Sequence, residues 1–162
     1  MVLDLHLVTF RVGTELFGVP IARVQDIVRL PTITQIPQAP GFVEGVINLH
    51  GRVIPIIDMR KRLGQISGDE VDVHDKRRRI LIVEAEHRRA GVIVDEIKEV
   101  IKLTEERVEA ASPTASGLSN QYIKGVGKLN DALILLIDIE KVLTADELTG
   151  IDSMHFTETR AT

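Results

Sequence analysis

Histidines, cysteines and paired carboxylates are the residues that most often carry chemistry, and this chain spaces them poorly for it. The chain has no cysteine, which excludes a thiol nucleophile, a disulfide and cysteine-ligated zinc. Its five histidines are never closer than 13 positions in sequence, so no paired-histidine metal motif is present. Its acidic pairs fall in predicted loops or helix starts, where carboxylates are normally solvated. The histidines are His6, His50, His74, His87 and His155. The acidic pairs are Asp69-Glu70, Glu105-Glu106 and Asp146-Glu147.

Nucleophilic and nucleotide-binding motifs are also missing. No G-x-S-x-G sequence occurs, and the serines lie in predicted loops or near the C-terminus. Gly125-Val126-Gly127 resembles the start of a phosphate-binding loop, but Asn130 stands where a third glycine is required. The residues that follow continue a strand instead of opening a helix. We therefore predict no catalytic residue, no metal and no cofactor, and a binding protein in place of an enzyme.

The composition favours a β-rich domain with few aromatic residues. The 162 residues include 18 Val and 19 Ile, which favour strands, whereas aromatic residues make up 3%. The net charge is −4, the reverse of a phosphate-binding footprint. Short runs of basic residues occur at 60–62, 76–79 and 88–89, and we interpret them as charged residues at solvated ends of loops. The alternative, a nucleic-acid-binding small β-barrel that uses Lys76 to Arg79 with Arg88-Arg89, is opposed by the acidic charge and the scarcity of stacking rings.

The hydropathy pattern predicts a cytoplasmic protein that does not insert into a membrane. The longest unbroken apolar run, Ala132 to Ile137, is far shorter than the ~18 residues that a membrane helix needs. Asp4 interrupts the N-terminal segment, and no basic stretch with an apolar run follows it.

An internal repeat organises the chain. A shift of 73 positions places His6 to Leu30 over Arg79 to Leu103 without a gap, with Gly18 over Gly91. A shift of 80 then places Gly45 to Leu63 over Gly125 to Leu143. Two units of about 70 residues follow, because a repeat of this kind marks one structural unit per copy.

Each unit reads as five short strands that can close into a small barrel. Hairpin turns are expected at Gly13-Thr14, His50-Gly51 and Asn130-Asp131. Asp58 and Asp138 are expected to cap helices, the second running over about 139–149, and residues 31–41 and 104–120 to form the long connections. The predicted strands are 5–12, 16–22, 24–30, 45–50 and 53–58 in the first unit, and 79–85, 89–95, 97–103, 122–129 and 132–138 in the second.

The segments that carry the repeat resemble the CheW family of bacterial chemotaxis coupling proteins over about residues 5–149. The most specific match is Gly45-Val-Ile-Asn-Leu-His-Gly-Arg-Val-Ile-Pro-Ile-Ile-Asp58, supported by segments 17–27, 91–95 and 122–129. The resemblance implies a mostly β fold of two packed five-stranded SH3-like barrels with short helices. It implies one CheW-like domain over 1–162, with repeat units at about 5–75 and 78–150 and a tail at 151–162. Whether the two barrels exchange strands stays open.

The resemblance also implies a non-catalytic adaptor of chemotaxis signal transduction. Its expected partners are the regulatory domain of the histidine kinase CheA, the cytoplasmic tip of methyl-accepting chemoreceptors, and other CheW copies in receptor arrays. Such a protein would be associated with the membrane only through receptor complexes.

Partner-binding residues are carried over from the family to matching positions of this chain. Asp26 replaces the glutamate that is commoner in the family, and His50 replaces the usual arginine, so a fixed cation becomes a titrating group. Val24 and Ile27 are either partner contacts or core residues, and Gly18 and Gly91 mark either a close approach of another backbone or a bulge. The predicted set is Val24, Asp26, Ile27, Gly45, His50, Gly51, Arg52, Gly91, Val92, Val94, Ile97 and Val100.

Overall fold

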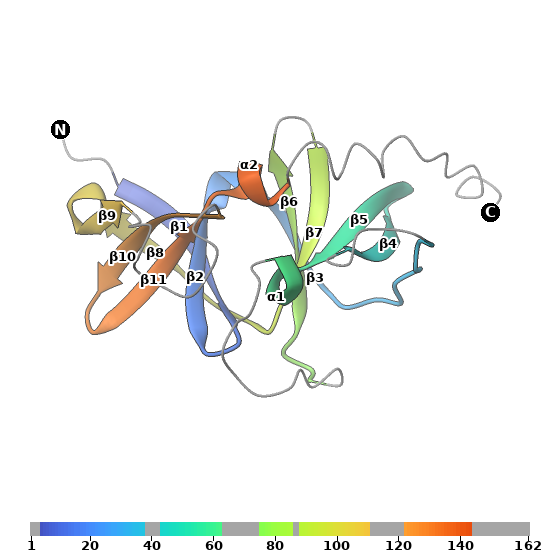
Figure 1. The fold of residues 1–162 in the computed structure, drawn as a ribbon, viewed down its shortest axis with the longest axis horizontal. Coiled ribbons are helices and arrows are strands. Elements are labelled where there is room, and N and C mark those ends of the chain that lie inside the picture. Colours follow the sequence, from blue (N-terminus) through green and yellow to red (C-terminus); the bar gives the residue numbers. More distant parts are fainter. Residues whose placement is uncertain (1–3, 38–42, 63–74, 86–87, 111–121, 144–162) are drawn as a thin grey trace.

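The described part of the protein is mostly β, with two sheets, two short α-helices and two 3-10 helices (Figure 1). The structure is a computed structural model that describes residues 4–37, 43–62, 75–85, 88–110 and 122–143. Each sheet curls into a small SH3-like barrel, as expected for the fold class. The first seven elements are β1 (Asp4–Val12), β2 (Glu15–Pro20), the 3-10 helix η1 (Ile21–Arg23), β3 (Val24–Arg29), β4 (Val43–Leu49), β5 (Arg52–Asp58) and α1 (Met59–Arg62). The others are β6 (Arg79–Ala85), β7 (Arg88–Val94), β8 (Glu96–Thr104), η2 (Glu105–Arg107), β9 (Val108–Ala110), β10 (Ile123–Leu129), β11 (Ala132–Ile137) and α2 (Ile139–Val142).

The two repeat units exchange strands. One sheet has the order β8-β1-β2-β11-β10-β9, and the other has the order β3-β6-β7-β5-β4. We call them barrel A and barrel B. The repeat makes five pairs of strands equivalent: β3 and β8, β1 and β6, β2 and β7, β5 and β11, and β4 and β10. Both barrels therefore have the same strand order, and wherever one barrel uses a strand of the first unit, the other uses the equivalent strand of the second unit. Barrel B therefore uses the continuous segment β3–β7, whereas barrel A joins the first two strands to the last four.

Three apolar clusters fill the molecule. One lies inside each barrel: Ile80 and Ile82 of β6 point into barrel B, and Leu7 of β1 points into barrel A. The third, which we call the central core, takes Leu81 and Val83 from the other face of β6 and joins the two barrels. Strands buried on both faces need apolar residues at every position, which explains the unbroken apolar runs of the sequence. The helices α1 and α2 lie at the junction and bury side chains in the central core (Figure 1).

The predicted turns and helix caps are confirmed. Gly13, His50, Gly51 and Asn130 have φ of 64°, 53°, 82° and 55°, the region that tight hairpin turns require. The Asp58 carboxylate accepts the Arg60 backbone N–H at 3.0 Å, and the Asp138 carboxylate accepts the Lys141 backbone N–H at 3.4 Å. Both aspartates thus satisfy amide groups at a helix start, as expected.

Several predicted boundaries differ from the structure. The second strand ends at Pro20, and Ile21–Arg23 form the first passage from barrel A to barrel B. The connection expected over 104–120 contains the short strand β9, which pairs with β10, so barrel A has six strands. The last helix ends at Val142, with Leu143 as its C-cap, whereas it is expected from the sequence to run over about 139–149; residues 144–149 and the tail lie outside the described residues.

Gly18 and Gly91 are glycines because barrel interiors crowd them. A Cβ at Gly91 would lie 2.6 Å from Ile56 Cδ1 and 2.6 Å from Ile80 Cγ2. At Gly18 the nearest atom would be Ile134 Cγ2 at 3.1 Å. The close approach is made by isoleucine side chains of the same barrel.

Replacing Gly91 with alanine is expected to lower the free energy of unfolding by about 1–3 kcal/mol, the usual effect of overpacking a filled core. The repeat-equivalent change Gly18→Ala should cost less, because its nearest neighbour is farther away. Urea denaturation of both variants measures the difference, and equal losses would show that the Gly91 contacts do not set the effect.

Candidate interaction surface

Four of the predicted partner-binding residues lie along the margin of the central core. Val24 and Ile27 of β3 pair with Val83 and Leu81 of β6, and both partners belong to the central core. Paired residues share one face of a sheet. Val24 and Ile27 therefore border this core from barrel B.

Barrel A repeats the arrangement. Ile97 and Val100 of β8 pair with Phe10 and Val8 of β1, again central-core residues. We call Val24, Ile27, Ile97 and Val100 the seam. Val24 and Ile97 are half-buried and pack against the central core. Ile27 and Val100 occupy equivalent repeat positions and are 41% and 58% exposed.

Two other large apolar residues of the described chain are similarly exposed. Ile21 of η1 is 44% exposed and lies three residues before Val24 in the sequence. Sequence reasoning missed Ile21, because it placed this residue inside the predicted strand 16–22, whereas the strand ends at Pro20 and Ile21 begins a 3-10 turn. Leu133 of β11, 58% exposed, lies away from both edge strands of the seam.

Four predicted site residues are buried inside the fold. Val92 and Val94 have no exposed surface and belong to the central core beneath the seam, so they do not line an exposed face. Gly91 faces the interior of barrel B. Gly45 has φ +149°, and a Cβ there would lie 2.1 Å from the Thr34 carbonyl oxygen. Its role is to let the segment around Thr34 bridge to β4, where Thr34 pairs with Val46.

The other predicted residues are exposed but outside the seam. Asp26 pairs with Ile82 of the barrel B interior, so it lies on the face opposite Ile27, and its carboxylate accepts the Ile27 backbone N–H at 2.8 Å. His50, Gly51 and Arg52 belong to the β4–β5 hairpin, at the other end of the strand order from β3. The structure therefore does not group this hairpin with the seam.

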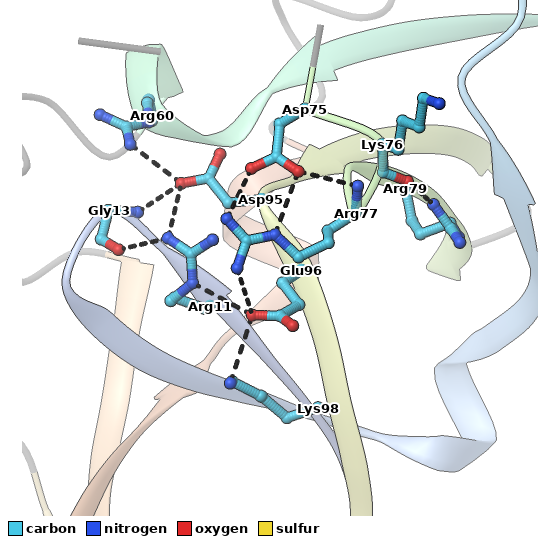
Figure 2. Close-up of polar contacts among 10 residues, drawn as sticks. All are labelled: Arg11, Gly13, Arg60, Asp75, Lys76, Arg77, Arg79, Asp95, Glu96 and Lys98. Atoms are coloured by element: carbon cyan, nitrogen blue, oxygen red, sulfur yellow. Dashed lines mark hydrogen bonds and ion pairs between the residues drawn. The ribbon is translucent and has the colours of Figure 1, made fainter. Parts of the chain in front are cut away.

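A polar cluster at the second passage between the barrels surrounds Asp95 (Figure 2). Asp95 lies between β7 of barrel B and β8 of barrel A and is 8% exposed. Its Oδ2 atom accepts the Gly13 backbone N–H at 2.7 Å and Arg60 Nη2 at 2.9 Å, with Arg11 Nη1 at 3.6 Å. Gly13 and Arg11 belong to barrel A and Arg60 to α1 after barrel B. One carboxylate thus ties the two barrels together where the chain crosses.

A second layer of charges lies over this cluster. Glu96 accepts Arg11 Nε at 3.4 Å and Lys98 Nζ at 3.2 Å, and Arg77 Nη1 lies 3.8 Å away. Arg77 also pairs with Asp75, and the side-chain hydrogen bond from Arg77 lowers the pKa of Asp75 to about 2. Asp58, close to the cluster in sequence at the start of α1, behaves oppositely. Burial raises its pKa, and Glu44 nearby adds to the rise.

The lowered pKa of Asp75 predicts a specific pH response. Because the folded pKa of about 2 is below the ordinary value of 3.8, the pair with Arg77 stabilises the fold fully above pH 3.8. That contribution is lost as the pH falls from 3.8 to about 2. NMR titration of the Asp75 carboxyl checks this, and a midpoint near 3.8 would contradict the pairing.

The described part of the chain assembles no candidate for catalysis or metal binding. Among these residues, no three His, Asp or Glu side chains gather as metal ligands. No helix in the described segments has the length and apolar character needed to cross a membrane. The chemistry that the surface offers is apolar contact at the seam and charge at its edges.

Fold and surface together define an interaction module: two strand-exchanged barrels that present repeat-equivalent apolar residues. The chain belongs to the family of CheW-like domains, whose model matches residues 6–147. It is 34% identical to the chemotaxis protein CheW of Klebsiella aerogenes, over 90% of this chain and 85% of that protein. It is 33% identical to the chemotaxis protein CheW of Treponema pallidum, over 92% and 88% of the two chains.

A solved structure agrees with this assignment. The crystal structure of the scaffolding protein TtCheW from Thermoanaerobacter tengcongensis has a TM-score of 0.79 and 34% identity to this chain, covering 90% of this chain and 96% of that one. The protein is therefore a chemotaxis adaptor of the CheW type and not an enzyme.

Proposed function

We propose that this adaptor couples the cytoplasmic tip of methyl-accepting chemoreceptors to the regulatory domain of the histidine kinase CheA. The observation that carries the proposal is the exposure of Ile27 and Val100 at equivalent positions of the two edge strands. Exposed aliphatic side chains that continue a buried core offer a partner helix a surface on which to bury its own apolar stripe.

The two partners would use different parts of the fold. The seam takes the helical tip of the receptor, because its side chains flank the central core from both barrels. A barrel of this chain packs on the homologous barrel of the kinase domain, in the cytoplasm at the membrane-attached receptors. Several weak contacts of this kind, including contacts between adaptor copies, hold an array together through multivalency.

Pull-down of the full chain with each purified partner tests the proposal. The probes are a soluble receptor fragment that contains the cytoplasmic tip, and the kinase regulatory domain, both from the source organism. Retention of both at about micromolar concentration is expected. If either partner is not retained at that concentration, the proposed coupling to that partner is wrong. Retention of RNA, with a steep dependence on salt, would instead support the rejected nucleic-acid function.

A further inference from the structure

Among the described residues, one pair of like charges next to the seam has no counterion. Arg29, the last residue of β3, pairs directly with Arg79, the first residue of β6. Residues paired in this way have Cβ atoms about 5 Å apart, and like charges directly opposite each other destabilise a sheet. Within the described residues, no carboxylate lies within ion-pair distance of either guanidinium.

The contacts that the structure describes hold Arg79 in place through neutral groups. Arg79 Nη1 donates to the carbonyl oxygens of Lys76 at 2.6 Å and Arg78 at 2.8 Å, so the group is anchored by neutral acceptors. Arg29 is exposed, and Arg79 is half-buried. Lys76 and Arg78 add positive charge to the same segment. An oxyanion brought by a partner would relieve this repulsion and gain charge-assisted hydrogen bonds.

The position of the pair relative to Ile27 identifies the source of the oxyanion. Arg29 is two residues beyond Ile27 on the same face of β3, which is about 7 Å along the strand. One turn of helix, four residues, covers about 6 Å. A helix lying along β3 with an apolar residue on Ile27 would therefore bring a side chain one turn away onto Arg29 and Arg79.

Barrel A carries the equivalent cation but has already neutralised it. Lys102 of β8 matches Arg29 in the repeat and follows Val100 by two residues, as Arg29 follows Ile27. Lys102 Nζ lies 3.2 Å from Asp4 Oδ2, and its strand partner is His6, where Arg29 faces another arginine. The two ends of the seam thus differ in charge, although the repeat makes them equivalent in shape.

We propose that Arg29 and Arg79 bind an Asp or Glu carboxylate of the helical partner that docks on the seam, about one helical turn from the apolar residue that covers Ile27. This inference rests on the proposed function, whose receptor tip it describes more closely. It also predicts that the acidic end of the partner lies at barrel B.

Binding of the full chain to the receptor-tip fragment, measured by calorimetry, tests the proposal. Arg29→Gln is expected to weaken binding about tenfold and to flatten its salt dependence, because it removes a charged hydrogen-bond donor. The matched control Lys102→Gln should change the dissociation constant by less than about twofold, because Lys102 already has a counterion in Asp4 and exposed ion pairs contribute little energy. Arg29→Gln should also raise the midpoint of thermal unfolding, because it removes the repulsion from Arg79.

A scan of the tip that replaces each Asp and Glu with its amide completes the experiment. One of these tip substitutions should weaken binding to the unmodified chain about tenfold. The same substitution should not weaken binding to the Arg29→Gln variant any further, as a double-mutant cycle requires for a direct pair. Unchanged binding of Arg29→Gln, or an equal loss for Lys102→Gln, would overturn the inference and leave the proposed function standing. Failure of the unmodified chain to bind the tip would overturn the function itself. Polyuridylate is tested in place of the tip. If it binds the unmodified chain and Arg29→Gln weakens that binding, the assignment of the ligand as a carboxylate is wrong.

Discussion

Replacing Ile27 with aspartate is expected to weaken binding of the receptor tip by about 30-fold or more. The side chain is 41% exposed, continues the central core and lies in an edge strand, so a partner helix would bury it completely. A carboxylate at this position loses its hydration on docking and removes the apolar surface that the partner would cover, and central contacts of an interface dominate its energy. Equilibrium binding by calorimetry measures the effect.

The chain offers a matched control for this substitution. Leu133→Asp places the same charge at another exposed aliphatic residue, outside the seam, and should leave tip binding unchanged. Val100→Asp should weaken binding as Ile27→Asp does, because the repeat makes the two positions equivalent. Both seam variants should stay folded, since their side chains are substantially exposed. Equal affinities for all three variants would show that the seam is not the docking surface.

Replacing Asp95 with alanine is expected to lower the free energy of unfolding by about 3 kcal/mol, the usual loss when one partner of a buried ion pair is removed. Asp95 accepts hydrogen bonds from Gly13 and Arg60, which belong to different barrels, and the variant removes the buried carboxylate that both groups contact. Urea denaturation followed by circular dichroism measures the change.

The first passage between the barrels supplies the comparison for Asp95. There Arg23 pairs with Glu140 of α2 at 2.9 Å, and Glu140 is the repeat equivalent of Arg60. The side chains of this pair are 43% and 47% exposed, so Glu140→Ala should cost less than about 1 kcal/mol. A loss for Asp95→Ala as small as the loss for Glu140→Ala would mean that burial of Asp95 does not strengthen its contacts.

Much of the fold is predictable because the repeat and the apolar runs agree. Strand 79–85 has the predicted bounds, and most other strands differ by one or two residues, since turn residues such as Gly13 and Asn130 delimit them. Strand exchange is not predictable in this way. Two units with the same apolar pattern satisfy either pairing equally, and only the register shows that β1 joins β8.

The candidate site is predictable only in part, for a related reason. Alternation along one strand indicates which residues share a face, but not whether that face is covered. Ile27 and Val100 stay exposed on edge strands, whereas Val92 and Val94 lie on an inner strand with both faces buried. Ile21 and the Arg29–Arg79 pair require the register between strands, which is not visible in the order of residues along the chain.

The exchange of strands has a consequence for the order in which the protein can be made. Barrel B consists of one uninterrupted stretch, so it can close while the ribosome is still adding the later strands. Barrel A needs β1 and β2, which are made before the strands of barrel B, together with β11, which is made after them. The apolar strands β1 and β2 must therefore wait for strands that are made only after barrel B before barrel A can close.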